Sequence, residues 1–371
     1  MDDPRLRCRA TTVTVLTVLA LSVILFPPFR SDAQSPDDRY PFVRDGKVGF
    51  IDSRGREVIA PQFSNAGDTA HFQDGLAPVF KAGEGSGYIA ASGRFAIGPS
   101  QVWGWGRPFH EGLAGVLIWA KSGGANRPGW IDCKGNFVFS GMGAEGGYFS
   151  EGLMSMPRNG KWGFVDKYFQ FVIEPKFDWA EEFSEGRAVV KIAEKWGYID
   201  KLGKVVIAAK YDLAWGFSDG LARVRNDLPN GKVMTMEGEQ NAYRYQYGFV
   251  DHDGKEVIPL RFEEATYFSE GFALAAPPNF KLLGVIDKRG NFVHGPEFDD
   301  AGEFHEGLAR ACVKQKCGYV DTGGVWVIPP SFTYAKDFWH GLAQVSWSDA
   351  ENSYIDKTGK TIWKNTSTKG H

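Results

Sequence analysis

The hydrophobic pattern of this chain repeats. A small residue, usually glycine, is followed by two adjacent apolar positions, most often an aromatic and then Ile or Val, and then usually by aspartate. Clear copies begin at Gly49, Gly129, Gly163, Gly197, Gly248 and Gly318, and degenerate copies begin at Gly87, Gly284 and Ser353. Neighbouring residues of a β-strand point to opposite faces, so two adjacent apolar positions predict a strand that is covered on both faces. The pattern therefore predicts nine buried strands.

The spacing of these strands defines a short repeat. Gly163 and Gly197 are 34 residues apart, and this is the most frequent spacing. In the copy at 149–183 we predict three strands, at 152–158, 161–166 and 171–174. Asn-Gly separates the first two and suits the positive φ angles of a two-residue hairpin turn. Proline ends the third strand, because it has no amide to donate.

A second motif, Phe-x-Glu/Asp-Gly-Leu-Ala, is predicted to turn the chain into the first strand of each unit, and a short connector such as 177–180 precedes it. The expected fold is all-β, a tandem repeat of about nine three-stranded antiparallel units. A whole unit stands at each end, whereas a propeller often shares a blade between its termini. We therefore expect an open, twisted, solenoid-like array, and a closed β-propeller-like ring is the alternative.

The N-terminal residues do not belong to the repeat. Arginines precede an uncharged apolar run at 10–26, and small residues lead to a cleavage site after Ala33. This layout predicts a secretory signal peptide at 1–33, with an uncleaved N-terminal anchor as the alternative. The expected location is the periplasm, the cell surface or the exterior. The other expected segments are a linker at 34–40, the repeat array at 41–364 and a C-terminal tail at 365–371.

The charge of the chain bears on two classes of partner. The chain has 42 Lys and Arg against 45 Asp and Glu, a net charge of −3. Such a mixed, near-neutral composition gives no reason to expect nucleic acid or anionic lipid. Membrane association is expected only through an uncleaved anchor.

Several strings resemble a known family. The segments 161–166 (Lys-Trp-Gly-Phe-Val-Asp) and 195–200 (Lys-Trp-Gly-Tyr-Ile-Asp), the Phe-Ser-Glu-Gly motifs and the Val-Ile-x-Pro strand ends are similar to the bacterial WG-repeat (KWG) family. The resemblance runs from about Tyr40 to Lys364. Only two copies keep the Trp-Gly pair followed by Phe or Tyr, so tryptophan is a packing preference here. The resemblance implies binding through repeats and supplies no catalytic residue.

No motif predicts catalysis. The segment 216–220 matches the Gly-x-Ser-x-Gly nucleophile elbow, but that motif needs a strand-to-helix turn, and no helical stretch follows. The motif aspartates recur once per repeat, as turn caps do. Histidines lack zinc-ligand spacing with cysteine. We therefore expect no catalytic residue, metal ligand or cofactor site.

Two cysteines predict a disulfide. Aligning Lys314-Gln315 with the Asn-Gly turn of the clear repeat places Cys312 opposite Cys317 in a hairpin. A non-hydrogen-bonded antiparallel pair of this kind is close enough to be bridged. In an oxidising compartment we expect the Cys312–Cys317 bond, and the alternative is two buried thiols.

Two features indicate a binding surface. The repeat between Gly197 and Gly248 carries an insertion at a hairpin tip that includes Tyr243 and Tyr245, and insertions at one position of an array often mark its binding side. The slot after Phe-Asp also varies freely among repeats, which suggests exposure. Trp179, Leu213 and Tyr334 occupy it. The alternative for the insertion is a tolerated surface loop without function, and the alternative for the variable position is core packing.

The predicted function is a non-catalytic repeat protein of the cell envelope or exterior. It would present an extended surface to a protein, peptide or glycan partner. An envelope hydrolase with a site formed between repeats and a purely structural spacer are the alternatives.

Overall fold

The computed structural model describes residues 38–64, 71–104, 106–120, 125–140, 147–235, 238–348 and 352–365. These residues form 33 strands in eight antiparallel sheets, and no helix occurs among them. The chain divides into two compact units, residues 1–144 with 365–371, and residues 145–364. The predicted signal peptide lies outside the described residues. Within the described part, no helix is long and apolar enough to cross a membrane.

The first unit contains ten strands: β1 (Tyr40–Arg44), β2 (Lys47–Ile51), β3 (Glu57–Ser64), β4 (Ala77–Lys81), β5 (Gly85–Ile89), β6 (Phe95–Ser100), β7 (Trp103–Gly104), β8 (Leu113–Ile118), β9 (Arg127–Asp132) and β10 (Phe137–Ser140). Strands β1–β6 form one sheet that combines two repeats, joined by the single pair Ser64 and Phe80. Strands β7–β10 form a four-stranded sheet.

The second unit begins with a sheet of three described strands: β11 (Met154–Arg158), β12 (Lys161–Val165) and β13 (Phe171–Phe177). Five four-stranded sheets follow: β14 (Trp179–Ser184), β15 (Arg187–Ile192), β16 (Lys195–Ile199), β17 (Val205–Tyr211); β18 (Leu213–Ser218), β19 (Leu221–Thr235), β20 (Gly238–Val250), β21 (Glu256–Phe262); β22 (Glu264–Ala265), β23 (Phe272–Ala276), β24 (Leu283–Asp287), β25 (Phe292–Phe298); β26 (Asp300–His305), β27 (Leu308–Val313), β28 (Lys316–Asp321), β29 (Trp326–Phe332); and β30 (Tyr334–Ala335), β31 (Leu342–Ser346), β32 (Ser353–Asp356), β33 (Thr361–Lys364).

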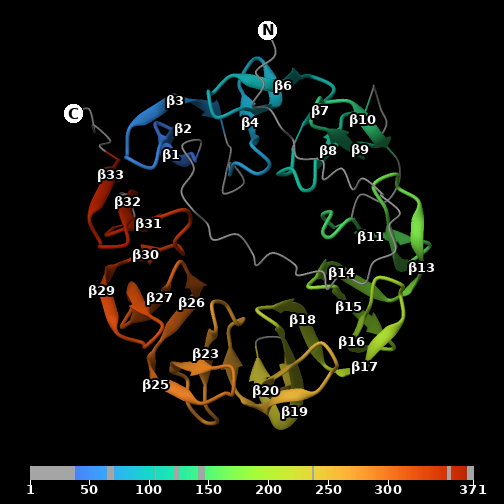
Figure 1. Ribbon diagram of the computed structural model, residues 1–371, viewed down its shortest axis with the longest axis vertical. Coiled ribbons are helices and arrows are strands. Elements are labelled where there is room, and N and C mark those ends of the chain that lie inside the picture. Colours follow the sequence, from blue (N-terminus) through green and yellow to red (C-terminus); the bar gives the residue numbers. More distant parts are fainter. Residues whose placement is uncertain are drawn as a thin grey trace, which may run out of the picture. The chain divides into compact units, whose positions relative to one another are not determined.

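In this unit the sheets follow one another along an arc. The first strands β14, β18, β26 and β30 lie on its inner side, and the last strands β17, β25, β29 and β33 on its outer side (Figure 1).

The expected three-stranded unit is wrong, because the connector is itself a strand. Residues 179–184 form β14, which pairs with β15 and makes the sheet four-stranded. The register shifts between Ala180 and Phe183, so these two buried residues are three apart and not two. Such a bulge hides the two-residue period by which a strand is recognised in sequence.

The core lies between sheets, as the doubly apolar strands predict. Phe164 and Val165 are both fully buried, although they point to opposite faces of β12. One typical layer packs Val189 and Tyr198 of the β14–β17 sheet against Ala222 and Val224 of the next sheet. Each hydrophobic strand is therefore shielded by its neighbours along the series.

The motif glycine and aspartate have the roles that their positions predict. A Cβ atom on Gly163 would lie 2.3 Å from the backbone oxygen of Ile173, so the adjacent strand leaves no room for a side chain. Asp166 caps its turn, since its Oδ1 accepts the amides of Tyr168 and Gln170 at 2.9 and 3.0 Å.

The acid of the Phe-x-acid-Gly motif ties neighbouring sheets together. Glu185 and Gly186 form a two-residue turn with φ angles of 52° and 76°, as in a type I′ hairpin. The Gly186 amide also donates to the carboxylate of Glu151 from the preceding repeat, at 3.1–3.2 Å. Lys201 is paired with the same carboxylate at 3.1 Å. The same hydrogen bond joins Glu185 to Gly220, Glu270 to Gly307 and Glu306 to Gly341.

Candidate functional site

The long insertion of the β18–β21 sheet extends two strands. Strands β19 and β20 are longer than the strands that flank them in the sheet. The pairing of β18 with β19 ends at Leu213 and Arg225, and the pairing of β21 with β20 ends at Phe262 and Tyr247. Their mutual pairing continues to Thr235 and Gly238. The insertion is therefore a two-stranded ribbon that projects from a four-stranded sheet.

On one side of this sheet, arginine residues of β19 lie next to aromatic residues of the neighbouring strands β18 and β20. Directly opposed residues of antiparallel strands point to the same face, and the register pairs Arg225 with Tyr247, Asp227 with Tyr245 and Pro229 with Tyr243. We call the set the Arg–Tyr face; it consists of Trp215, Arg223, Arg225, Tyr243, Tyr245 and Tyr247. The structure thus places two of the sequence-predicted residues, Tyr243 and Tyr245, on this face, and Leu213 lies opposite Arg225 at the start of β18.

Arg223 anchors the buried end of the Arg–Tyr face. Its guanidinium lies 4.0 Å from the ring centre of Trp215 and 4.4 Å from that of Tyr267, which follows β22 in the next repeat. It also donates to the carbonyl oxygen of Ala265. Burial lowers the pKa of Arg223, but an arginine begins so high that it stays charged. The cation is therefore held rigidly between aromatic rings.

Arg225 is fixed in a similar way one step further along the strand. Its guanidinium lies 4.3 Å from the Tyr245 ring centre and donates to both carboxylate oxygens of Asp227, at 2.7 and 3.0 Å. The Asp227 amide donates to Asp212, which is paired with Lys195 at 2.6 Å. Burial lowers the pKa of Arg225, but hydrogen bonds with Tyr247 and Asp227 outweigh it, so the net shift is upward.

The face becomes more exposed toward the ribbon. Trp215 stacks on Tyr247 with ring centres 5.7 Å apart, whereas Tyr243 and Tyr245 are 47% and 43% exposed. Preordered tyrosine and arginine side chains are the residues that dominate binding at protein interfaces. The geometry suits a surface that receives a partner without rearranging its own side chains.

Trp179 and Tyr334 do not join this face. Each is the first residue of its own sheet, in β14 and β30, in the slot that Leu213 occupies in β18. They are 43% and 47% exposed. The Trp179 ring is 4.5 Å from that of Trp162, so part of its surface serves packing.

Sequence reasoning missed Arg223, Arg225, Trp215 and Tyr267. The available signal was the two-residue alternation of Arg223, Arg225 and Asp227, matched by that of Tyr243, Tyr245 and Tyr247. Recognising it required the hairpin register, because the two runs are separated by the insertion.

A hydrolase would need carboxyl groups with shifted pKa values, and three partly buried carboxyl groups have raised pKa values. Burial, with the neighbouring Glu182, raises the pKa of Glu181 to about 7. Burial also raises the pKa of Glu303 and of Asp337, although His305 opposes both shifts. Among the described residues, no group of His, Cys, Asp and Glu has the arrangement of a metal site.

Cys312 and Cys317 form a disulfide on a different sheet. They face each other across the β27–β28 hairpin, with Cα atoms 3.9 Å apart and an S–S distance of 2.07 Å. The bond closes the hairpin next to the Lys314-Gln315 turn, whose φ angles of 51° and 62° are those of a two-residue hairpin turn.

Comparison with solved structures identifies the fold. A eukaryotic initiation factor matches 88% of this chain and 96% of its own, with a TM-score of 0.61 and 10% identity. BamB from Moraxella catarrhalis matches 68% of this chain and 86% of its own at 12% identity, but its TM-score of 0.40 is too low to support an argument. No curated protein matches the sequence significantly.

The fold is a β-propeller with four-stranded blades, so the expected open, solenoid-like array of three-stranded units is wrong. The error has the same cause as the missed fourth strand. Three-stranded units would have left the connectors free to link an open stack, whereas as strands they complete propeller blades.

The sequence also matches the model of the WG containing repeat, in agreement with the resemblance noted above. The matched residues are 49–84, 162–196, 196–227, 247–275, 284–317 and 318–346. Since these stretches together cover more than half of the sequence, the chain belongs to the WG-repeat family.

Proposed function

We propose that this propeller is a non-catalytic binding protein that holds a partner protein or peptide on its Arg–Tyr face. The observation that carries the proposal is the gradation along that face, from the enclosed Arg223 to the exposed Tyr243 and Tyr245. A buried anchor next to exposed aromatic rings is the arrangement of an interface hot spot.

Preorganisation supports a binding role. Binding costs free energy whenever flexible side chains must be ordered, about 0.5–1.5 kcal/mol for each one. Arg223 and Arg225 are already held by aromatic rings, and Arg225 is also paired with Asp227. The face therefore offers a partner charge and ring surface with little further ordering.

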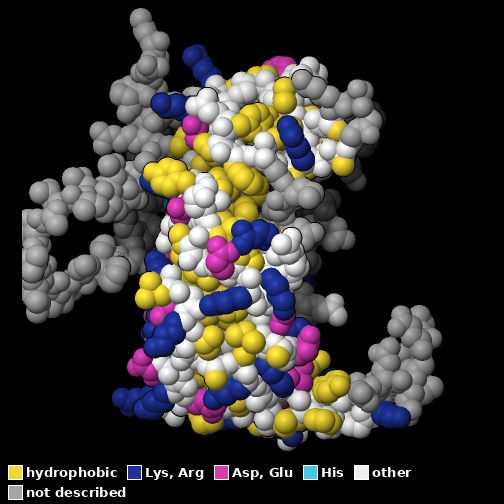
Figure 2. Space-filling view, turned by 90° about the vertical axis from the view of Figure 1, so that its right-hand side faces the viewer, with side chains coloured by type: hydrophobic (Ala, Val, Ile, Leu, Met, Phe, Trp, Pro, Cys, Tyr) yellow, Lys and Arg dark blue, Asp and Glu magenta, His cyan; other side chains and the backbone are white. Residues whose placement is uncertain are grey.

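The distribution of charge favours a protein partner over nucleic acid. Lys and Arg side chains alternate with Asp and Glu over the side of the molecule shown in Figure 2. Nucleic-acid binding surfaces collect one sign of charge into a patch or stripe. Tyrosine and arginine together suit protein segments that carry carboxylates and carbonyl oxygens.

An exported location forms part of the proposal. The Cys312–Cys317 bond and the N-terminal apolar run preceded by arginines both support it, because disulfides persist in oxidising compartments. Mass spectrometry of the protein from its native cells tests this location. Export predicts a mature chain that starts after Ala33 or an intact anchor in the membrane fraction, and a full-length protein in the cytosol contradicts it.

Affinity capture tests the binding role. The wild-type chain and a Tyr243→Ser/Tyr245→Ser variant are immobilised and exposed to an envelope extract, and retained proteins are quantified. Tyr168→Ser is the matched control, because Tyr168 is an exposed tyrosine on the β12–β13 turn of another sheet. Any retained protein is then purified and its affinity for all three chains is measured.

The proposal predicts at least a tenfold weaker affinity for the double variant and an unchanged affinity for Tyr168→Ser. Equal affinities for all three chains would remove the Arg–Tyr face from the binding surface. Capture that survives protease treatment of the extract would identify a glycan and reject the protein partner.

A further inference from the structure

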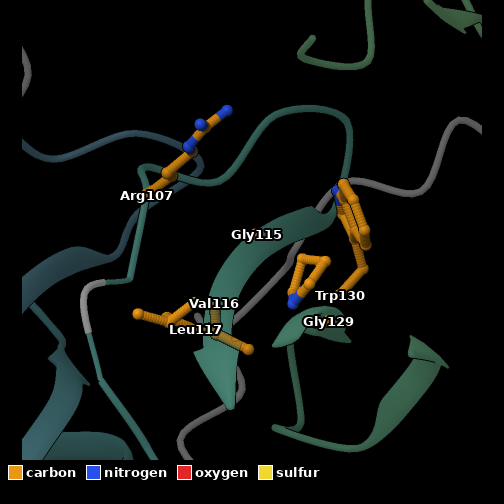
Figure 3. A pocket seen from close by; sticks show the side chains of 7 residues that line it. Arg107, Gly115, Val116, Leu117, Gly129 and Trp130 are labelled. Atoms are coloured by element: carbon orange, nitrogen blue, oxygen red, sulfur yellow. The ribbon is translucent and has the colours of Figure 1, made fainter. Parts of the chain in front are cut away.

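The first unit holds a pocket of about 180 Å³ on the β7–β10 sheet. Its lining residues are Arg107, Gly115, Val116, Leu117, Pro128, Gly129 and Trp130. Arg107 and Trp130 lie on opposite sides of the Gly115 segment, with Leu117 and Val116 further along β8 (Figure 3). This pocket belongs to a single sheet and is separate from the Arg–Tyr face.

The pocket occupies the position that Arg223 fills in the β18–β21 sheet. Gly115 lies opposite Trp130 in the register, as Arg223 lies opposite Phe249. Arg107 corresponds to Trp215, because the carbonyl of each accepts the hydroxyl of a buried tyrosine, at 2.8 and 2.9 Å. The two sheets therefore share one site, which is filled in the second and open in the first.

A single residue makes the difference. In each repeat, one residue of the preceding strand lies opposite the motif aromatic, which Val285 replaces in one repeat. In the other eight repeats this residue has a side chain: Pro41, Pro78, Ser155, Val189, Arg223, Leu274, Arg310 and Gln344. Only the β8 repeat has glycine there. The backbone does not require it, since Gly115 has no positive φ. A Cβ atom would meet Arg107 at 3.5 Å and Trp130 at 3.8 Å, which is ordinary contact.

The pocket walls define the chemistry of an occupant. Leu117, Pro128 and Trp130 supply apolar surface, and an engineered apolar cavity of about 150 Å³ binds benzene. The space of about 180 Å³ therefore fits one six-membered ring. The exposed cation of Arg107 at the rim favours a negative group on that ring, because guanidinium pairs well with carboxylate.

We propose that this pocket binds a small aromatic carboxylate. The ring lies over Gly115 beside Trp130, and the carboxylate faces Arg107. The same chemistry is found in a free acid and in the C-terminal aromatic residue of a peptide.

The test measures binding of 3-phenylpropionate to the full chain by ligand-observed NMR and by calorimetry. For a ligand of this size we expect a dissociation constant of about 0.1–5 mM. Gly115→Val fills the pocket with the side chain that Val189 places at the same position. Arg107→Gln removes the charge, and 3-phenylpropionamide is the uncharged counterpart of the ligand.

The proposal predicts at least tenfold weaker binding of the acid to Gly115→Val, whose unfolding midpoint stays the same or rises. Arg107→Gln weakens the acid about fivefold and leaves the amide unchanged. Acid binding that is undetectable in the wild type, or equal in wild type and Gly115→Val, overturns the site. Equal binding of acid and amide by the wild type overturns the ligand class.

The peptide Gly-Gly-Phe with a free C-terminus separates the two sources of the ligand. Tighter binding of the peptide than of 3-phenylpropionate assigns the pocket to peptide ends, and weaker binding assigns it to free acids. Both results depend on the same loss of binding in Gly115→Val.

Discussion

Replacing the motif glycine by alanine tests the close approach of strands that defines each repeat. In Gly163→Ala the new Cβ would lie 2.3 Å from the oxygen of Ile173 and 2.7 Å from the nitrogen of Pro175. Both atoms belong to the backbone of β13, so no side-chain rotation relieves the overlap. Because Gly163 has no positive φ, the cost arises from crowding alone.

The magnitude follows from the displacement required. An ordinary contact needs about 3.4 Å or more, so β13 must move by about 1 Å relative to β12. Overpacking of this kind costs about 1–3 kcal/mol. Loss of a strand hydrogen bond adds about 1 kcal/mol. We therefore expect the free energy of unfolding to fall by about 2–4 kcal/mol.

Urea unfolding followed by tryptophan fluorescence measures the effect, and Gly115→Ala is the matched control. Its Cβ would find no atom closer than 3.5 Å, and alanine is favoured over glycine in a strand by about 0.5–1 kcal/mol. The unfolding midpoint should fall in Gly163→Ala and rise in Gly115→Ala. Equal midpoints in the two variants would refute the argument that backbone contact selects the motif glycine.

Three further predictions concern charge and covalent structure. Because the folded pKa of Glu181 is about 7 against an ordinary 4.5, the unfolded chain loses this proton first and stability falls as pH rises between those values. Glu181→Gln should thus stabilise by about 1–3 kcal/mol at pH 8, and equal denaturation midpoints for the two proteins at pH 8 would contradict this. Replacing Cys312 and Cys317 by serine should cost about 2 kcal/mol, whereas peptide mapping that finds both thiols free would reject the bond. Asp219→Asn removes the carboxylate that accepts the Gly271 amide, so the free energy of unfolding should fall by about 1 kcal/mol at low salt and by less at high salt.

The buried strands and their turns could be predicted because their signals are local. Phe164 and Val165 are adjacent apolar residues, and this alone indicates cover on both faces. Asn159 and Gly160 have the positive φ angles, 54° and 76°, that their residue types allow. The same turn alignment paired Cys312 with Cys317 correctly in register.

The fourth strand and much of the site could not be predicted, since their signals are not local. Strand β14 contains a bulge that breaks the two-residue period, so it resembled a connector. Arg223 gains its meaning from Tyr267, which follows a strand of the next repeat. The pocket at Gly115 is visible only when equivalent positions of different repeats are aligned through their registers.

Hydrogen exchange on the segment 179–184 tests the central claim, that this connector is a paired strand of a four-stranded blade. Measured by mass spectrometry, its amides should exchange more slowly than those of an unfolded peptide of the same sequence, because β14 pairs with β15 at Ala180 and Phe183. Exchange of 179–184 at the rate of an unfolded peptide, while 187–192 remains protected, would contradict the account.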